Sequence, residues 1–293
     1  YINSIYDIAR YVNSMYKPVV MTNDDYHKHK NYSSTNVRAF LDNDEKGLAS
    51  LVPSTKPPSK AMLEGTAVHA YIGEPHLFKR DFVCKPVDLS LRTKEGKQWA
   101  ADNADKIVLD TEFYNNLPYI AESFYRSPAK DIYLKDGLVE RSFFWEDDYG
   151  VSCKCRPDWI SKDFRRVIDL KTTADAHPRK FKRSIVDYRY DIQAAFYMRG
   201  VEVCTKVTPE VFYFIAIEKV APFCVAVYQI TDDWLLIGQK DVHEALYRID
   251  RVIQSGEPQG YTPEIMALSP PEWMNSPSKK KVTPLNYHEI PLF

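Results

Sequence analysis

The alternation of polar and apolar residues is clearest in the middle of the chain, and it predicts a sheet there. This stretch contains two turn signals, Glu-Asp-Asp-Tyr-Gly and Ser-Lys-Asp-Phe-Arg. The pattern predicts antiparallel strands joined by short turns, over residues 138–146, 150–160 and 165–172. Two later runs rich in β-branched and aromatic residues predict two more strands, over residues 210–219 and 223–231.

Apolar residues recur at helical intervals on both sides of this sheet. The predicted helices cover residues 1–19, 32–44, 61–78, 90–127, 187–204 and 232–256. We expect the segment 90–127 to be mostly solvated, and Gly65 lets its helix lie close to a neighbour. A loop rich in proline and serine, residues 51–60, separates the second and third helices.

This order of elements describes one α/β core, with a mixed central β-sheet flanked by helices. A Rossmann domain is disfavoured because no glycine-rich turn follows the first strand. We expect an N-terminal arm or helix over residues 1–19, a core domain over 20–256, and a proline-rich tail over 257–293 that packs on the surface.

Composition adds little to this picture. The 293 residues carry a formal net charge of −1, with 44% hydrophobic and 27% charged residues, as is usual for globular proteins. No global positive field indicates nucleic-acid binding, so such binding requires local basic patches. Without an apolar run long enough to span a bilayer, we expect no membrane association. The first residue is Tyr1, which indicates a fragment whose preceding residues are unknown.

The five cysteines are an odd number and include no Cys-x-x-Cys pair, which favours a reducing, cytoplasmic location. Cys153 and Cys155 are spaced as alternate residues of a strand. They are either structural cysteines, which we favour, or metal ligands.

The candidate chemistry lies on the predicted central strands. Asp158 and Asp169 fall on adjacent strands, and Lys171 shares a strand face with Asp169. Carboxylates held close together repel each other unless a cation bridges them, and Mg²⁺ or Mn²⁺ prefers such oxygen ligands. An ammonium group beside them can stabilise the charge that develops on a phosphate. Alone, the pattern fits surface charges about as well as a metal-dependent nuclease.

The flanking residues favour the nuclease interpretation. Gln193 and Tyr197 lie four residues apart on one face of the helix after the Asp-x-Lys strand. His69 lies on a helix with small residues, where its imidazole could be a metal ligand or a packed core residue.

Together, Gly-x-x-x-His, Glu, Pro-Asp, Asp-x-Lys and Gln-x-x-x-Tyr resemble the PD-(D/E)xK (restriction-endonuclease-like) superfamily. The segments WEDDYGVSCKCRPDWI, VIDLKTTAD and DYRYDIQAAFY resemble the nuclease domain of the exonuclease VIII family, the RecE-type recombination exonucleases. The resemblance covers residues 20–275 approximately, with all motifs in the same order.

The resemblance implies a role for each motif residue. Asp158, Asp169, His69 and the backbone carbonyl of Leu170 would be metal ligands for Mg²⁺ or Mn²⁺, with two ions per site. Lys171 would position the attacking water. Three more residues would complete the site: Glu140 as an acid reaching a second metal, and Gln193 and Tyr197 as braces or DNA contacts. Glu140 could also be an exposed strand charge, and Tyr197 could be plain core packing.

Basic and hydroxyl side chains near these motifs are candidate DNA contacts, or merely a solvated face. They are Lys154, Arg156, Thr172, Thr173, Arg179, Lys180, Lys182 and Arg183. Phe181, Tyr188 and Tyr190 could stack on an unpaired base.

The resemblance implies a Mg²⁺-dependent 5′–3′ exonuclease acting on double-stranded DNA ends and leaving 3′ overhangs. It also implies a homo-oligomer, with a ring-shaped tetramer favoured, a RecT-type single-strand annealing partner, and a bacterial, phage or prophage origin. Alternatives are an endonuclease, a Cas4-like enzyme, or a catalytically silent DNA-binding protein. The dispersed cysteines disfavour a Cas4-like iron–sulfur cluster.

Overall fold

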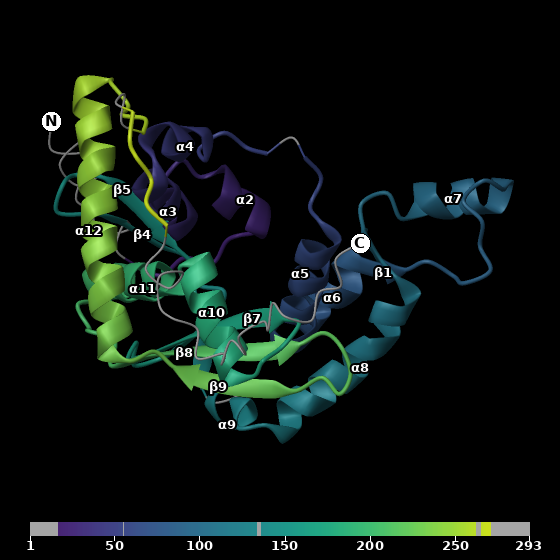
Figure 1. Ribbon diagram of the computed structural model, residues 1–293. Helices are drawn as coiled ribbons and strands as arrows, with labels where there is room; N and C mark the ends of the chain where they lie inside the picture. Colours follow the sequence, from purple (N-terminus) through teal and green to yellow (C-terminus); the bar gives the residue numbers. More distant parts are fainter. Residues whose placement is uncertain (1–16, 55, 134–135, 262–264, 271–293) are drawn as a thin grey trace, which may run out of the picture. The chain divides into compact units, whose positions relative to one another are not determined.

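The computed structural model describes residues 17–54, 56–133, 136–261 and 265–270 (Figure 1). Two compact units divide the chain, Tyr1–Gln259 and Gly260–Phe293, and every helix and strand named below lies in the first. The predicted N-terminal helix falls almost wholly outside the described residues, as does the tail from residue 271 onward.

A five-stranded mixed sheet forms the centre of the fold, as predicted. Its strand order is β3-β6-β7-β8-β9, and only the β7–β8 pair is parallel. The strands are β3 (Gly137–Val139), β6 (Trp159–Ser161), β7 (Arg166–Thr173), β8 (Val211–Glu218) and β9 (Val225–Gln229). A parallel pair requires a crossover, and α10 (Pro178–Tyr188) and α11 (Tyr190–Thr205) supply it.

The hairpin that precedes β7 is bent, so the prediction of two continuous strands over 138–146 and 150–160 is wrong. Its far half pairs separately as β4 (Phe143–Glu146) and β5 (Ser152–Cys155). At the bend, Glu140 adopts a left-handed backbone conformation with φ of 50°. Its N–H donates to the carbonyl of Asp158 over 3.1 Å. The bend therefore places two acidic residues side by side.

The first unit contains further helices outside this crossover. They are α2 (Asn23–Lys28), α3 (Ser34–Asp42), α4 (Asp44–Ala49), α5 (Lys60–Gly73), α6 (Pro75–Asp81), α7 (Lys94–Asp102), α8 (Thr111–Arg126), α9 (Ala129–Tyr133) and α12 (Asp232–Ser255). A small parallel sheet, β1 (Phe82–Cys84) and β2 (Ile107–Leu109), was not predicted. Among the helices in the described ranges, none combines the length and apolar content needed to cross a bilayer.

The segment 90–127 is mostly exposed, as predicted, but it is not one helix, because β2 separates α7 from α8. Its helix α8 buries one face, including Phe113, Leu117 and Phe124. The predicted helix at 32–44 corresponds to α3, whereas the predicted helix at 61–78 divides into α5 and α6 at Glu74, because this residue leaves the helical conformation.

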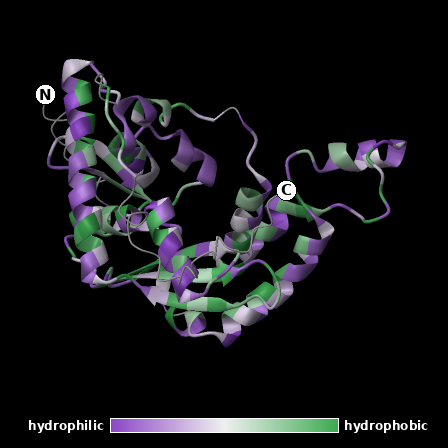
Figure 2. Cartoon of the chain, viewed as in Figure 1, coloured by the Kyte–Doolittle hydropathy of each residue, from purple (hydrophilic) through white to green (hydrophobic). Residues whose placement is uncertain are grey.

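Two hydrophobic clusters pack on opposite faces of the sheet. Along β7, Val167 belongs to the cluster beneath α11 and α12, whereas Ile168 and Leu170 belong to the cluster beneath α5 and α8. Side chains alternate between faces along a strand, so Asp169 and Lys171 face α11. Figure 2 shows hydrophobic residues concentrated in the strands of the central sheet and hydrophilic residues on α10 and α12.

Helices α11 and α12 approach each other closely at Gly238. A Cβ atom there would lie 2.3 Å from the backbone oxygen of Asp191. Such a distance is far below van der Waals contact, so any larger residue must push the helices apart.

The substitution Gly238→Ala tests this contact. Alanine favours an exposed helix by about 1 kcal/mol over glycine, but overpacking costs about 1–3 kcal/mol, so we expect a net loss of unfolding free energy. Urea unfolding followed by circular dichroism measures the change. Lys240→Ala, on the exposed side of the same helix, is the control and should leave stability nearly unchanged. A more stable Gly238→Ala variant would contradict the close approach.

Candidate active site

Asp158 is fixed by the pairing of β6 with β7. Trp159 lies opposite Ile168 in this antiparallel pair, so Asp158, the residue before β6, lies beside the part of β7 that follows Ile168. Oδ2 of Asp158 accepts a hydrogen bond from the N–H of Leu170 over 2.5 Å. Only 9% of Asp158 is exposed. The carboxylate therefore points across β7.

His69, Glu140 and Asp158 form a group that could hold a metal ion. Their ligand atoms all lie within 4.8 Å of one another, and it is the one such group found in the described part of the chain. Nδ1 of His69 lies 3.3 Å from Oδ1 of Asp158. One imidazole nitrogen and two carboxylates, brought together by α5, the hairpin bend and β6, suit a divalent cation.

Asp169 and Lys171 form a second group with Gln193 of α11. Nζ of Lys171 lies 2.7 Å from Oδ2 of Asp169 and donates to Oε1 of Gln193 over 2.7 Å. Nε2 of Gln193 donates to Oδ1 of Asp169 over 2.7 Å. The structure thus brings Asp169 against Lys171 rather than into the group around His69. The N–H of Leu170, rather than its carbonyl, contacts Asp158.

The buried carboxylates perturb one another. Burial and the nearby charge of Asp158 raise the pKa of Glu140 to about 8. Burial raises the pKa of Asp169 to about 6, although Lys171 opposes the shift. His69 and Asp158 form an ion pair. Burial opposes the charged form of each, yet their mutual attraction raises the pKa of His69 to about 9 and lowers the pKa of Asp158. A divalent cation would stabilise the ionised forms of these carboxylates and so lower their raised pKa values.

Oδ2 of Asp169 gives a second indication of a cation site. This oxygen is buried and has no hydrogen-bond partner among the described residues, so it faces only the Lys171 ammonium. Such an oxygen retains a lone pair for a metal ligand. The residues present therefore fit a divalent ion.

Tyr190 is an unpredicted neighbour of Lys171. The Lys171 ammonium lies 4.5 Å from the centroid of the Tyr190 ring and 5.7 Å from that of Phe214. The sequence does carry a signal for this contact, because Tyr190 precedes Gln193 by three residues and so shares its helix face.

Tyr197 and the two threonines lie at the edge of this arrangement. Tyr197 is part of the core cluster, and burial raises the pKa of its phenol well above the usual value while its hydroxyl contacts Gln193. Thr172 faces α5, where a Cβ atom on Gly65 would lie 3.2 Å from its hydroxyl oxygen. The hydroxyl of Thr173 donates to the carbonyl of Asp175.

Lys154 and Arg156, predicted as DNA contacts, are buried instead. Nζ of Lys154 donates to the carbonyls of Tyr26 and His29 over 2.7 and 2.6 Å. Arg156 donates to the Ser142 hydroxyl and stacks over the Tyr26 ring. Their charged groups therefore anchor the segment around α2 and do not form a surface for DNA.

The other predicted basic residues are exposed on α10. Arg179, Lys180, Lys182 and Arg183 all lie on the solvent side of this helix, and Arg183 pairs with Asp187 over 3.3 Å. They remain candidate DNA contacts. Phe181, in contrast, is buried and stacked on Tyr228, so the prediction that it stacks on a base is wrong.

Comparison with known proteins agrees with this geometry. Residues 33–265 match the family described as "PDDEXK-like domain of unknown function (DUF3799)". The chain belongs to this family. The match covers both groups of site residues, so the fold is a PD-(D/E)xK fold. No curated protein sequence matches the chain significantly.

One solved structure shares the fold of this PDDEXK-like domain, and a second is only weakly similar. A protein from Eubacterium rectale described as "Putative exonuclease" superposes with a TM-score of 0.60 at 14% identity, over 89% of this chain and 99% of that one. An alkaline exonuclease from Laribacter hongkongensis covers 65% of this chain and 94% of its own, at 10% identity and a TM-score of 0.28. The first likeness supports the fold, and the second is too weak to carry an argument.

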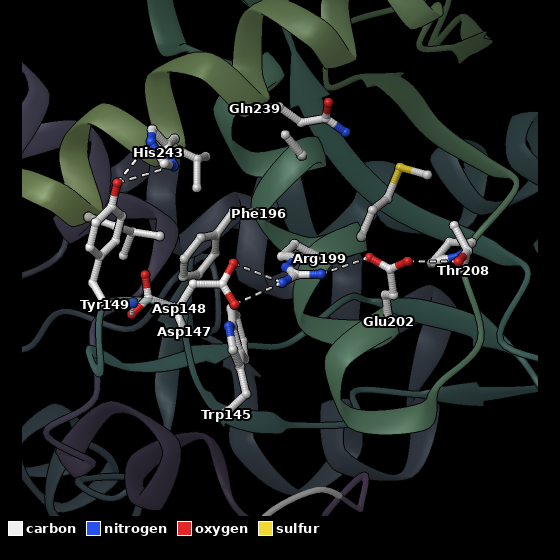
Figure 3. Close-up of a pocket in the computed structure, with 15 residues that line it drawn as sticks. Trp145, Asp147, Asp148, Tyr149, Phe196, Arg199, Glu202, Thr208, Gln239 and His243 are labelled. Carbon is white, nitrogen blue, oxygen red and sulfur yellow. Dashed lines mark hydrogen bonds and ion pairs between the residues drawn. The ribbon is translucent and has the colours of Figure 1, made fainter.

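A cavity of about 330 Å³ lies elsewhere in the PDDEXK-like domain, between the β4–β5 hairpin, α11 and α12 (Figure 3). It contains none of the predicted site residues. Its charged groups satisfy one another, since Arg199 pairs with Asp148 and Glu202. The hydroxyl of Tyr149 likewise contacts His243. The candidate active site is therefore on the other side of α11.

Glu140 gives a pH-dependent test in metal-free protein. Its pKa rises from 4.5 when unfolded to about 8 when folded, so between these values the folded state binds more protons and stability falls as pH rises. Glu140→Gln removes this loss, and we expect the variant to be more stable at about pH 8 in EDTA, by roughly 1 kcal/mol. The difference should close toward pH 4.5.

Urea unfolding at several pH values measures this difference. The control is Glu244→Gln, an exposed residue of α12 that pairs with Arg248. Its unfolding free energy should not show this dependence on pH. Added Mg²⁺ or Mn²⁺ should stabilise the unaltered protein more than Glu140→Gln, because a ligand is lost. A variant less stable than the unaltered protein at pH 8 would refute the crowding of these acids.

Proposed function

We propose that this protein is a divalent-metal-dependent exonuclease that hydrolyses phosphodiester bonds at the ends of double-stranded DNA. The observation that carries the proposal is the adjacency of two groups, His69–Glu140–Asp158 and Asp169–Lys171–Gln193, across strand β7 of a PD-(D/E)xK fold. The description of the Eubacterium rectale protein as an exonuclease supports the same activity.

His69, Glu140 and Asp158 would hold the ion, with Asp169 as a further ligand through its buried Oδ2, which also pairs with the Lys171 ammonium. A divalent ion such as Mg²⁺ or Mn²⁺ supplies Lewis-acid chemistry and stabilises negative charge on the phosphate. We propose two ions per site, because the acids form two neighbouring groups.

Lys171 and Gln193 have distinct roles in the proposed reaction. The Lys171 ammonium aims the attacking water at phosphorus and offsets charge on the phosphate oxygens. Gln193 donates to Asp169 and accepts from Lys171, so it keeps both side chains at a fixed spacing. The water attacks in line, the bond from phosphorus to the 3′ oxygen breaks, and a 5′-phosphorylated nucleotide leaves. Tyr197 braces Gln193 from the core.

The finer properties rest on the sequence resemblance to RecE-type exonucleases. We propose 5′–3′ polarity, 3′ single-stranded products for recombination, a homo-oligomeric ring of four subunits, and a single-strand annealing partner of the RecT type. A cytoplasmic location in a bacterium, with a phage or prophage origin, belongs to the same proposal. The exposed basic residues of α10 would contact the DNA backbone.

Other nucleases of the superfamily and a silent DNA-binding protein are the competing functions. A Cas4-like enzyme is disfavoured because, among the residues described, no cysteine joins a metal-ligand group. Cys153 and Cys155 are buried on β5, and burial raises the pKa of both thiols. Protonated buried thiols are structural rather than metal-binding.

Digestion of labelled DNA tests the proposed activity. Linear duplexes labelled at the 5′ or the 3′ end are incubated with Mg²⁺ or with EDTA, beside a circular plasmid. We expect release of the 5′ label first, no cleavage in EDTA, and an intact circle, because an exonuclease requires an end. Nicking of the circle would instead indicate an endonuclease.

Substitutions in the two groups should abolish this activity without unfolding the chain. We expect Asp158→Asn, Asp169→Asn and Lys171→Ala each to lower the cleavage rate by roughly 10²-fold or more. Asp148→Asn, an exposed acid paired with Arg199, is the matched control and should cleave normally. Circular dichroism checks folding. Normal cleavage by folded Asp158→Asn would refute the assignment.

A further inference from the structure

Two tyrosine rings connect Lys171 to solvent. The ring of Tyr190 lies over the Lys171 ammonium at 4.5 Å, and the ring of Tyr188 stacks on that of Tyr190 at 5.6 Å with an interplanar angle of 23°. Tyr190 is half-buried against Phe214, whereas Tyr188 is 56% exposed. The stack therefore begins at the proposed catalytic lysine and ends in an open aromatic face.

The corner that holds this stack is rigid. Arg189, between the two tyrosines, adopts a left-handed conformation with φ of 54°, which separates α10 from α11. Its guanidinium pairs with Asp191, which is buried, and with Asp241 of α12. Arg38 of α3 donates to the carbonyl of Tyr188 over 2.8 Å. Four elements thus fix a backbone conformation that few non-glycine residues adopt.

Core packing does not account for Tyr188. Phe181, one of its neighbours on α10, is buried and stacked on Tyr228, as a core ring should be. Tyr188 instead exposes most of its side chain at a rigidly held position. Fixed, exposed aromatic rings beside basic residues are typical of single-strand nucleic-acid binding, where each base stacks on a ring.

We infer that Tyr188 is a base-stacking subsite for an unpaired nucleobase close to the phosphate being cleaved. The phosphate would lie by Lys171, and the chain of rings leads from there to the base. Stacking would hold the frayed end of a strand open and would be tolerant of sequence, because every base has an aromatic face. This inference rests on the proposed nuclease function for its substrate class.

The test measures DNA binding without cleavage. Duplexes with 2-aminopurine at each of the last three nucleotides of either strand are titrated with the protein in EDTA. We expect quenching of the aminopurine fluorescence at one position by the unaltered protein and by Tyr188→Phe, which keeps the ring. Tyr188→Ala should lose the quenching and bind about tenfold more weakly.

An abasic nucleotide at the quenched position separates stacking from a change of fold. If the ring contacts that base, then removing the base should abolish the difference in affinity between the unaltered protein and Tyr188→Ala. Tyr125→Ala, an exposed tyrosine of α8, is the matched control and should bind like the unaltered protein on every duplex.

The outcomes distinguish this inference from the proposed function. Equal binding and quenching by Tyr188→Ala would overturn the stacking subsite, even if the protein cleaves DNA. Position-specific quenching that requires Tyr188 would support it, even if no DNA were cleaved with Mg²⁺ and the nuclease function failed. Loss of binding that persists with the abasic duplex would also overturn it, since the ring would then act through something other than the base.

Discussion

The hydrogen bond from the Leu170 N–H to Asp158 is the constraint on which the site depends. It fixes the first acid across β7, and the adjoining bend brings Glu140 to the same place through its own hydrogen bond to the Asp158 carbonyl. Two backbone interactions thus hold two acidic side chains, Asp158 and Glu140, together against their repulsion. The two hydrophobic clusters pack both faces of the sheet, and their burial supplies the free energy that offsets this repulsion.

Helix α11 adds a second group of polar side chains beside this constraint. Its inward side presents Gln193 to Asp169 and Lys171, and its first residue places an aromatic ring over the same ammonium. Its other side packs against α12 at Gly238. Because α11 belongs to the crossover that leaves β7, the acid, the lysine and the amide belong to one short segment of chain. Their spacing is therefore set by local geometry together with one helix–sheet contact.

The sequence predicted the elements with strong periodicity. Strands β7, β8 and β9 and helix α12 lie where the pattern placed them, and the alternation along β7 correctly put Asp169 and Lys171 on one face. The bend at Glu140 was not predictable, since alternation continues through it and only the tertiary structure shows the left-handed residue. The buried face of α8 did carry a sequence signal that the prediction overlooked, because Phe113, Leu117 and Phe124 recur at helical intervals.

The largest error in the site concerned cations rather than acids. A lysine or arginine beside a proposed phosphate site suggests a surface contact, and sequence spacing cannot show that carbonyl oxygens 125 or more residues away accept its protons. The contact of Tyr190 with Lys171 was missed because the sequence indicated Tyr190 only as a candidate base contact. The direction of each side chain, set by long-range contacts, decided both cases.

The anchoring of Lys154 and Arg156 has a consequence for how the chain can be shortened. Both cations lie in the hairpin that carries Glu140 and Asp158, and their partners, Tyr26, His29 and Thr22, lie far upstream. A version of the protein beginning after α2 would lose the Tyr26 carbonyl that accepts from Lys154 and the Thr22 carbonyl that accepts from Arg156, a few residues from Asp158. The segment around α2 is therefore part of the packed fold, and its removal would require compensating changes in the hairpin.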